Sequence, residues 1–361
     1  MIRNILVTAA GSPGFISLHK ALHSIQEICN DIVVHGCDIN ANSIGLKLCD
    51  KSFITVKGSS NQYISNLLSY CQNNNIDLII PCSDEELIPL SSSKHLFENI
   101  GCQVLVSSSQ SLETILDKSL LFNFCSNNAL NDYVVHHYVC NNVEDLIVKY
   151  NKLKNLNYQV CVKPTKTHGS RGFKIISESI SISKEDFFNK KLNPHYISLD
   201  SLCDILSQGD GTFQDLFVME YLPNQEYSVD CCKTQNEFLC VPRTREIIKE
   251  GICVAGTVTK NTELINAAHH LYRALGLTYH ANIQFKYNNN GEPKLLEINP
   301  RFSGTMEHCR AAGINFVEVA IRDILKLPPL NYTIKWKTNM MRVWNELFWY
   351  KNNKMFVMGD Q

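Results

Sequence analysis

The chain has 361 residues, which is long enough for two or three domains. Its 34 basic and 35 acidic residues nearly balance, and no dense run of Lys and Arg is present, which argues against nucleic-acid binding. Hydrophobic residues make up 44% of the chain, yet no apolar stretch reaches the roughly 18 residues of a membrane span. The 15 cysteines are scattered without a CxxC pair, a pattern typical of reduced cysteines. We therefore expect a cytoplasmic globular protein that binds neither nucleic acid nor membrane.

The first hundred residues alternate between apolar runs and helical patterns. Helices are expected where apolar residues share one face, within 15–25 and 64–71. Strands are expected at four places: Ile5–Thr8, Ile32–Cys37, Asp77–Pro81 and Gln103–Val106. Short units of this kind predict a parallel, doubly wound sheet of the Rossmann type. A domain boundary is expected near 108.

Beyond this boundary the pattern indicates a mixed α and β arrangement. Helices are expected at three places: 112–124, 264–275 and 315–326. Strands are expected at five: 133–139, 159–163, 173–176, 217–221 and 227–232. The stretch from 179 to 211 has weak periodicity and is interpreted as an insertion or mobile region. The tail from Asn331 is expected to form a strand and a helix that pack on the body of the protein.

An N-terminal glycine turn joins the first strand to the first helix. Ala9–Gly14 follows a strand, and Asp38 ends the second strand, which together resemble a dinucleotide fingerprint. The first Gly of that fingerprint is missing, and tight turns need Gly for purely structural reasons, so the structural interpretation is favoured. The three acids Asp84–Glu86 follow the third strand. They could contact a cationic group of a substrate, or simply form a solvated first turn of the next helix.

A β-hairpin over 281–301 gives the sharpest local signal. Asn290-Gly291 is the preferred pair for a two-residue type I′ turn. This turn would place Gln284 opposite Glu297, and the pairing would continue back along both strands.

The alternation of side chains along a strand then divides this hairpin into two faces. One face carries amide and carboxylate groups, namely Asn282, Gln284, Glu297 and Asn299. The other face is expected to enter a core, with Ile283, Phe285, Leu296 and Ile298. Such oxygens suit Mg²⁺, and Arg301 could bind phosphate or carboxylate as a planar fork. The competing interpretation is an amphipathic hairpin whose polar face is solvated.

Two lysines and a loop are candidates for contacts with phosphate groups. Lys163 lies on an otherwise apolar strand, where a buried ammonium is costly unless it meets an anion. The polar loop 165–172 follows it and could offer backbone N–H groups to phosphates. Lys118 lies in an apolar helix and would, by itself, be a solvated residue.

The stretch from Phe217 to Asp230 lies between the lysines with their loop and the hairpin over 281–301. Taken together, these segments resemble the ATP-grasp superfamily. The motifs that carry the resemblance, in chain order, are Lys118, Val-Lys-Pro at 162–164 with the glycine-containing loop after it, Glu-Tyr-Leu at 220–222, Glu-Tyr-Ser-Val-Asp at 226–230 and Glu-Ile-Asn-Pro-Arg-Phe-Ser-Gly at 297–304. The order is most similar to the branch of the carbamoyl-phosphate synthetase large subunit, here with a single grasp unit. The resemblance implies a Rossmann-like pre-ATP-grasp domain over 1–108 and a two-lobed ATP-grasp domain over 109–330. The small lid lobe would lie within 112–215, and 331–361 would be a tail on the body.

The resemblance also implies roles for individual residues. ATP would be held by Lys118, Lys163, Gly169, Ser170, Arg171, Gly172, Glu220, Tyr221, Leu222, Glu226 and Gln284. Mg²⁺, for which Mn²⁺ could substitute, would be held by Gln284, Glu297 and Asn299. Catalysis and substrate contacts would fall to Lys163, Arg243, Arg245 and Arg301. The number of metal ions stays open, because the motif offers only one carboxylate.

The implied activity is an ATP-dependent ligase that forms an acyl phosphate and releases ADP and phosphate. Its partners would be a small carboxylate and an amine, with an amino acid or amino-sugar acid as the expected class, and the protein could be a homodimer. One alternative is a nicotinamide-dependent oxidoreductase built on the glycine turn. Another is an ATP-binding regulatory module without chemistry.

Overall fold

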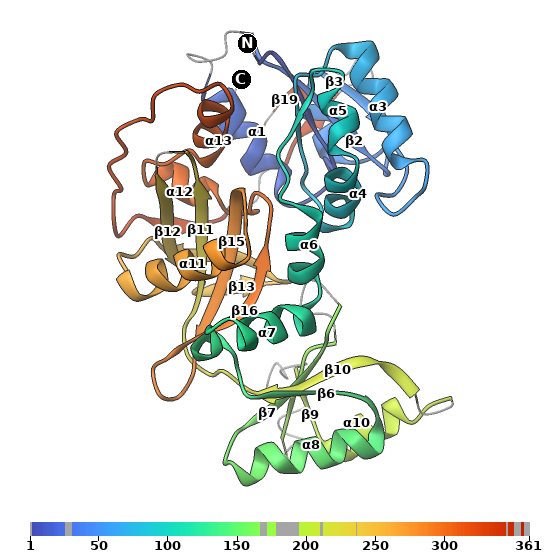
Figure 1. Cartoon of the computed structure of the whole chain (residues 1–361), viewed down its shortest axis with the longest axis vertical. Coiled ribbons are helices and arrows are strands. Elements are labelled where there is room, and N and C mark those ends of the chain that lie inside the picture. Colours follow the sequence, from blue (N-terminus) through green and yellow to red (C-terminus); the bar gives the residue numbers. More distant parts are fainter. Residues whose placement is uncertain are drawn as a thin grey trace.

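The N-terminal part of the chain is a parallel sheet with the strand order β3-β2-β1-β4-β5 (Figure 1). A computed structural model describes residues 2–25, 31–166, 172–177, 195–209, 212–235, 237–343, 346–349 and 355–356. The central strand is buried on both faces, because Ile5 and Val7 enter one core and Leu6 enters another. The alternation of strands and helices thus yields the expected doubly wound sheet.

The elements of this part follow one another with short connections. The strands are β1 Asn4–Val7, β2 Val33–Asp38, β3 Lys51–Ile54, β4 Leu78–Ile80 and β5 Gln103–Val104. The helices are α1 Phe15–His23, α2 Ile44–Leu48, α3 Tyr63–Asn74, η1 Asp84–Glu86, α4 Leu87–Ser92 and α5 Lys94–Glu98. Strand β3, which the sequence pattern did not predict, is mostly exposed at the sheet edge and therefore lacks a long apolar run.

A break at Asp117 divides the helix that was expected over 112–124. The structure has two helices, α6 Ser109–Leu116 and α7 Lys118–Asn127. The Asp117 side chain caps the second helix, because its Oδ1 accepts hydrogen bonds from the backbone N–H groups of Ser119 at 2.9 Å and Leu120 at 3.4 Å. Lys118 consequently begins a helix and is buried.

The lobe at the bottom of Figure 1 is a second sheet with the order β6-β10-β7-β8-β9. Helices α8 and α10 lie along one side of it, where apolar residues of the sheet and both helices form a separate core. The strands are β6 His137–Asn142, β7 Val160–Pro164, β8 Lys174–Ile176, β9 Tyr196–Ile197 and β10 Thr212–Glu220. The helical segments are η2 Asn131–Tyr133, α8 Val143–Asn155 and α10 Leu199–Leu206. The described part of the expected insertion, 195–209, thus has regular structure.

A third, antiparallel sheet with the order β12-β11-β15-β16 forms the body of the second half. Helix α11 packs on it and contributes to its core. The strands are β11 Glu226–Lys233, β12 Phe238–Thr244, β15 Tyr279–Tyr287 and β16 Pro293–Asn299. The helices are α11 Thr262–Ala274, α12 Glu307–Ala311 and α13 Phe316–Ile324.

The tail returns to this body as a strand. β17 Asn339–Met341 pairs with β14 Ile252–Thr257, which in turn pairs with β13 Ile247–Lys249. Two further short strands, β18 Phe348–Trp349 and β19 Met355–Phe356, pair with each other. The described residues of the tail contain no helix, and the expected helix stays a prediction.

Every cysteine among the described residues is free. None of the helices in the described ranges is both long and apolar enough to pass through a membrane.

Candidate active site

A cavity of about 420 Å³ lies where the two C-terminal sheets and the N-terminal domain meet. The sheet of the lower lobe contributes Lys163, and the hairpin of the body contributes Glu297. Several other predicted residues line the same cavity, namely Lys118, Glu220, Tyr221, Leu222, Glu226, Arg245, Gln284, Asn299 and Arg301. The structure thus brings together side chains and backbone that lie up to 183 residues apart in the chain.

The hairpin β15–β16 has the predicted register at its polar end. Gln284 pairs with Glu297, and Asn282 pairs with Asn299. The predicted turn, however, is wrong. Only Gly291 of the central pair has a positive φ, +76°, whereas a type I′ turn needs two such residues.

The hairpin instead closes with a three-residue loop. Asn288 accepts a hydrogen bond from Gly291 N–H at 3.2 Å and donates its own N–H to the Glu292 carbonyl at 3.0 Å. Gly291 in the left-handed region is typical of a turn that ends in a bulge. This turn shifts the pairing by one residue, so that Phe285 faces Leu295. A second bulge between Gln284 and Phe285 restores the register.

The second bulge changes which leucine enters the core. Leu295 is fully buried among the apolar side chains of the body, whereas Leu296 lines the cavity. Leu296 also packs, partly buried, against the edge of that core, so the expectation that it points into the core holds only in part. The other three residues assigned to that face, Ile283, Phe285 and Ile298, are buried in the core as expected.

Lys163 approaches the hairpin from the opposite sheet. Its Nζ donates to the carbonyl of Leu296 at 3.4 Å and lies 5.9 Å and 6.0 Å from the ring centres of Phe122 and Phe217. Burial, followed by the like charge of Lys118, lowers the pKa of Lys163 to about 8. No carboxylate forms an ion pair with this lysine among the described residues. A bound anion would therefore stabilise the charged form of Lys163.

Nucleotide binding near pH 8.5 should therefore be accompanied by proton uptake at Lys163. With a pKa of about 8, roughly three quarters of Lys163 is neutral at that pH, and nearby phosphates would raise its pKa and restore the charge. Calorimetric titration of a non-hydrolysable ATP analogue with Mg²⁺ in two buffers of different ionisation enthalpy measures this uptake. The binding enthalpy should depend on the buffer in the wild type and not in Lys163→Met. A buffer-independent enthalpy in the wild type would contradict the prediction.

The connection between β10 and β11 places three more residues at the cavity. The N–H of Glu220 is bonded to the His136 carbonyl at 2.9 Å, so any contact of its backbone with a ligand would use the carbonyl. Leu222 is buried at the cavity wall. Glu226 forms an ion pair with Arg245 at 2.9 Å. Arg245 also donates to the Gly251 carbonyl at 2.7 Å, which holds the β13–β14 connection against the site.

Arg301 is paired with one of the three acids that follow β4. Its Nε donates to Asp84 Oδ1 at 2.8 Å, and both side chains line the cavity. Glu86 has a different role, because it is buried and accepts bonds from Thr8 at 2.6 Å and from the backbone of Ser83 at 2.9 Å. Of the three acids, Asp84 therefore lies at the cavity, whereas Glu86 has a structural role.

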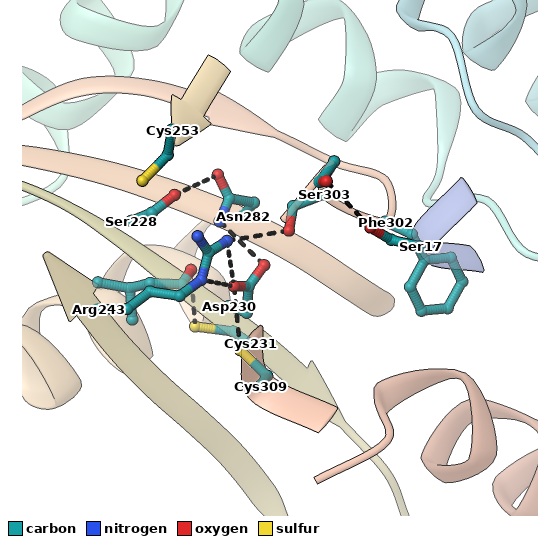
Figure 2. A network of polar contacts seen from close by, with 12 residues as sticks. Ser17, Ser228, Asp230, Cys231, Arg243, Cys253, Asn282, Phe302, Ser303 and Cys309 are labelled. Carbon is teal, nitrogen blue, oxygen red and sulfur yellow. Dashed lines mark hydrogen bonds and ion pairs between the residues drawn. The ribbon is translucent and has the colours of Figure 1, made fainter. Parts of the chain in front are cut away.

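Arg243 is not among the residues that line the cavity. Its side chain is fully buried, and its Nε donates to Asp230 Oδ2 at 2.6 Å (Figure 2). Asp230 also accepts from Asn282 at 2.9 Å and lies 3.2 Å from His280. Burial alone would raise the pKa of Asp230, but Arg243 and then His280 outweigh it and hold this pKa well below its ordinary value. Direct contact between Arg243 and a substrate stays a prediction.

The predicted phosphate loop is only partly described. Gly169, Ser170 and Arg171 lie outside the described residues. Gly172 has a φ of +72°, and a Cβ there would lie 2.8 Å from Pro164, so the turn back into β8 needs a glycine.

The N-terminal glycine turn is structural in the way the sequence favoured. Asp38 accepts the N–H of Gly11 at 2.6 Å and that of Asn40 at 2.8 Å, so its carboxylate is engaged by backbone. A Cβ at Gly11 would lie 2.5 Å from Ser43 Oγ. The following residues 12–14 nevertheless line one end of the large cavity, which the sequence did not indicate.

Several other cavity residues were not predicted. Ser303 and Gly304 end the Glu-Ile-Asn-Pro-Arg-Phe-Ser-Gly motif but were given no role, and Thr305 directly follows it. The connection 248–253 also lines the cavity, although nothing in its sequence marks it.

Comparison with known families and structures agrees with this arrangement. Residues 5–105 match the family described as PylC-like, N-terminal domain. Residues 212–346 match the family described as ATP-grasp in the biosynthetic pathway with Ter operon. A search of curated proteins found no sequence relative.

Solved structures share the fold at low sequence identity. N5-carboxyaminoimidazole synthetase from Staphylococcus aureus, complexed with ADP, has a TM-score of 0.66 at 13% identity, over 92% of this chain and 80% of that one. Biotin carboxylase from Campylobacter jejuni, in a complex named with β,γ-ATP, has a TM-score of 0.65 at 17% identity, over 92% and 74%. L-amino acid ligase from Bacillus licheniformis has a TM-score of 0.59 at 12% identity, over 90% and 74%.

The family matches indicate an ATP-grasp domain over residues 212–346, preceded by a PylC-like N-terminal domain over residues 5–105. The solved structures share the fold of nearly the whole chain. The expected fold, a Rossmann-like domain followed by an ATP-grasp fold, is confirmed. The domain limits at 108 and 330 stay a prediction.

Proposed function

We propose that this protein is an ATP- and Mg²⁺-dependent ligase that joins a small carboxylate to an amine through an acyl phosphate. The observation that carries the proposal is the convergence of Lys163 and the Gln284/Glu297 face on one cavity. A buried cation stands on one side of this cavity and oxygen donors on the other, which suits a nucleotide triphosphate with its metal.

The residues of the hairpin fit a magnesium ion. Gln284, Glu297 and Asn299 offer oxygen donors from one face. Asn299 donates its amide N–H to Glu297 at 3.2 Å, and its own oxygen accepts from Arg301 Nη2 at 3.4 Å. The described residues contain no group of three His, Cys, Asp or Glu suited to a metal, so phosphate oxygens would complete the coordination. When bound, Mg²⁺ offsets negative charge on the phosphates.

Phosphoryl transfer would then use the positions of the remaining side chains. An oxygen of the substrate carboxylate attacks the γ-phosphorus, and the bond to the bridging oxygen breaks to release ADP. Lys163 and Arg301 offset charge on the transferred group. The amine nitrogen attacks the acyl carbon, phosphate leaves with the C–O electron pair, and the amine loses a proton to solvent. Glu226 would accept the ribose hydroxyls once Arg245 moves away from it.

The nicotinamide alternative is not supported by a specific contact, because Asp38 is engaged by the backbone of its own loop. Calorimetry with Mg·ATP and with NAD separates the two activities, and only Mg·ATP should bind. A screen of amino acids and sugar acids, each with and without an amine, for ADP release then tests the ligase. Nucleotide binding without ADP release from any pair would favour the regulatory module.

A further inference from the structure

The tail brings an additional arginine against the wall at one end of the cavity, where it contacts a lining residue without being one itself. Arg342 follows β17, and its backbone N–H donates to the Val254 carbonyl at 2.8 Å. Its guanidinium donates through Nη2 to the carbonyl of Gly304, a cavity residue. That same carbonyl accepts from Ser17 of α1 at 3.0 Å. The tail, the loop after Arg301 and the start of α1 therefore meet at this end of the cavity.

Arg243 lies near this end of the cavity, and one edge of its guanidinium makes no hydrogen bond to the described residues. Its Nε and Nη2 donate to Asp230 and Ser303, at 2.6 Å and 3.0 Å. Its Nη1 is buried and has no hydrogen-bond partner among the described residues. Figure 2 shows the free edge of this guanidinium on the side of Ser228 and Cys253, both of which line the cavity. A buried cationic donor without a partner costs free energy unless a ligand completes it.

Arg342 differs from the other arginines near the cavity in its lack of a carboxylate partner among the described residues. Arg301 is paired with Asp84, Arg245 with Glu226 and Arg243 with Asp230, whereas Arg342 has no carboxylate partner in the part of the chain that the structure describes. Burial lowers the pKa of Arg342, and the like charge of Arg243 lowers it further, against the opposing effect of Cys253. Two neighbouring guanidiniums, of which only Arg243 is paired with a carboxylate, are stabilised by a further anion.

We propose that Arg342 and the free edge of Arg243 form a subsite for an anionic group of the substrate, beyond the carboxylate that is phosphorylated. This inference rests on the proposed function, because it takes the cavity as the place of the reaction. Lys163 and Arg301 already serve the reacting end. The substrate is therefore an acid that bears a second carboxylate or a phosphate group.

Anion binding tests the subsite without turnover. The protein is saturated with Mg²⁺ and a non-hydrolysable ATP analogue, so that the γ-phosphate position is filled, and malonate or inorganic phosphate is titrated by calorimetry. Arg342→Gln should weaken binding of the anion that the wild type takes by about tenfold or more. Arg342→Lys should keep part of the affinity. Arg310→Gln serves as the matched control, since Arg310 is half exposed and pairs with Glu307 on α12.

The outcomes separate this inference from the proposed function. Equal anion affinity in Arg342→Gln and the wild type overturns the subsite, as does a wild type that binds neither anion. Failure of the nucleotide analogue to bind overturns the proposed function instead, and the anion titration without nucleotide still tests the subsite. In the ADP-release screen, a preference for dicarboxylic over phosphorylated acids, or the reverse, identifies the second group. A clear preference for simple monocarboxylic acids contradicts it.

Discussion

Lys163→Met should reduce ADP formation by several powers of ten while leaving the fold intact. The ammonium group of Lys163 is the cation that the lower lobe presents to the cavity from β7, and phosphoryl transfer depends mainly on such electrostatic contacts. Methionine keeps the length and apolar contacts of the side chain, whose end lies over the rings of Phe122 and Phe217. ADP release with the best substrate pair from the screen measures the effect.

The same substitution should raise stability in the absence of nucleotide. The pKa of Lys163 falls from 10.5 to about 8 on folding, so the unfolded chain holds this proton more tightly than the folded one. The resulting destabilisation is complete below about pH 8 and disappears as the pH rises toward 10.5. Removing the charge should therefore stabilise the protein by about 1 to 3 kcal/mol at neutral pH, from ~1.4 kcal/mol per pKa unit.

Denaturant unfolding of the wild type and Lys163→Met at several pH values measures this gain, which should shrink above about pH 8. Lys260→Met is the control, because Lys260 is an exposed residue before α11 and should change neither stability nor activity. Loss of stability together with loss of activity in Lys163→Met would indicate a structural role for the ammonium group. Unchanged ADP release would remove Lys163 from the proposed site.

Glu297→Ala should also reduce ADP formation by several powers of ten. Glu297 is the carboxylate of the predicted magnesium ligands, and the two amides beside it, Gln284 and Asn299, carry no charge. Loss of this charge should raise the concentration of Mg²⁺ needed for half-maximal ADP release. The initial rate of ADP release over a series of Mg²⁺ concentrations separates weaker metal binding from a loss of rate at saturation.

Glu292→Ala provides the matched control on the same hairpin. The Glu292 side chain is 54% exposed and pairs with Lys294 outside the cavity, so its removal should leave the Mg²⁺ dependence unchanged. The prediction for Glu297 fails if its variant has the magnesium requirement and rate of the wild type.

The β15–β16 hairpin shows which features can be predicted from local sequence patterns and which cannot. The pairing of Gln284 with Glu297 was derived from a two-residue turn that the structure does not have, and it holds because the bulge beside Gln284 compensates for the longer loop. The turn was wrong because Asn290-Gly291 also suits a loop in which only the glycine takes a positive φ. The bulge that compensates for this loop leaves no mark in the sequence, so the position of Leu296 could not be predicted.

Residues that depend on distant contacts were the least predictable. The acidic stretch after β4 was recognised as a candidate, but only the tertiary structure separates Asp84, which pairs with Arg301, from the buried Glu86. The resemblance implied a substrate contact for Arg243, and a lone arginine in a strand gives no sign of its ion pair with Asp230 on the neighbouring strand. Arg342 carried no signal at all, since its place depends on the pairing of the tail with β14.

The two irregularities of the β15–β16 hairpin act as a matched pair. The three-residue loop removes one position from the pairing, and the bulge beside Gln284 adds it back. Because side chains alternate, either change alone would turn Glu297 and Asn299 into the apolar interior and bring Ile298 to the cavity. An insertion or deletion of one residue at the tip is therefore tolerable only together with an opposite change near Leu296. The number of residues at this remote tip thereby determines which side chains reach the cavity at the other end of the strands.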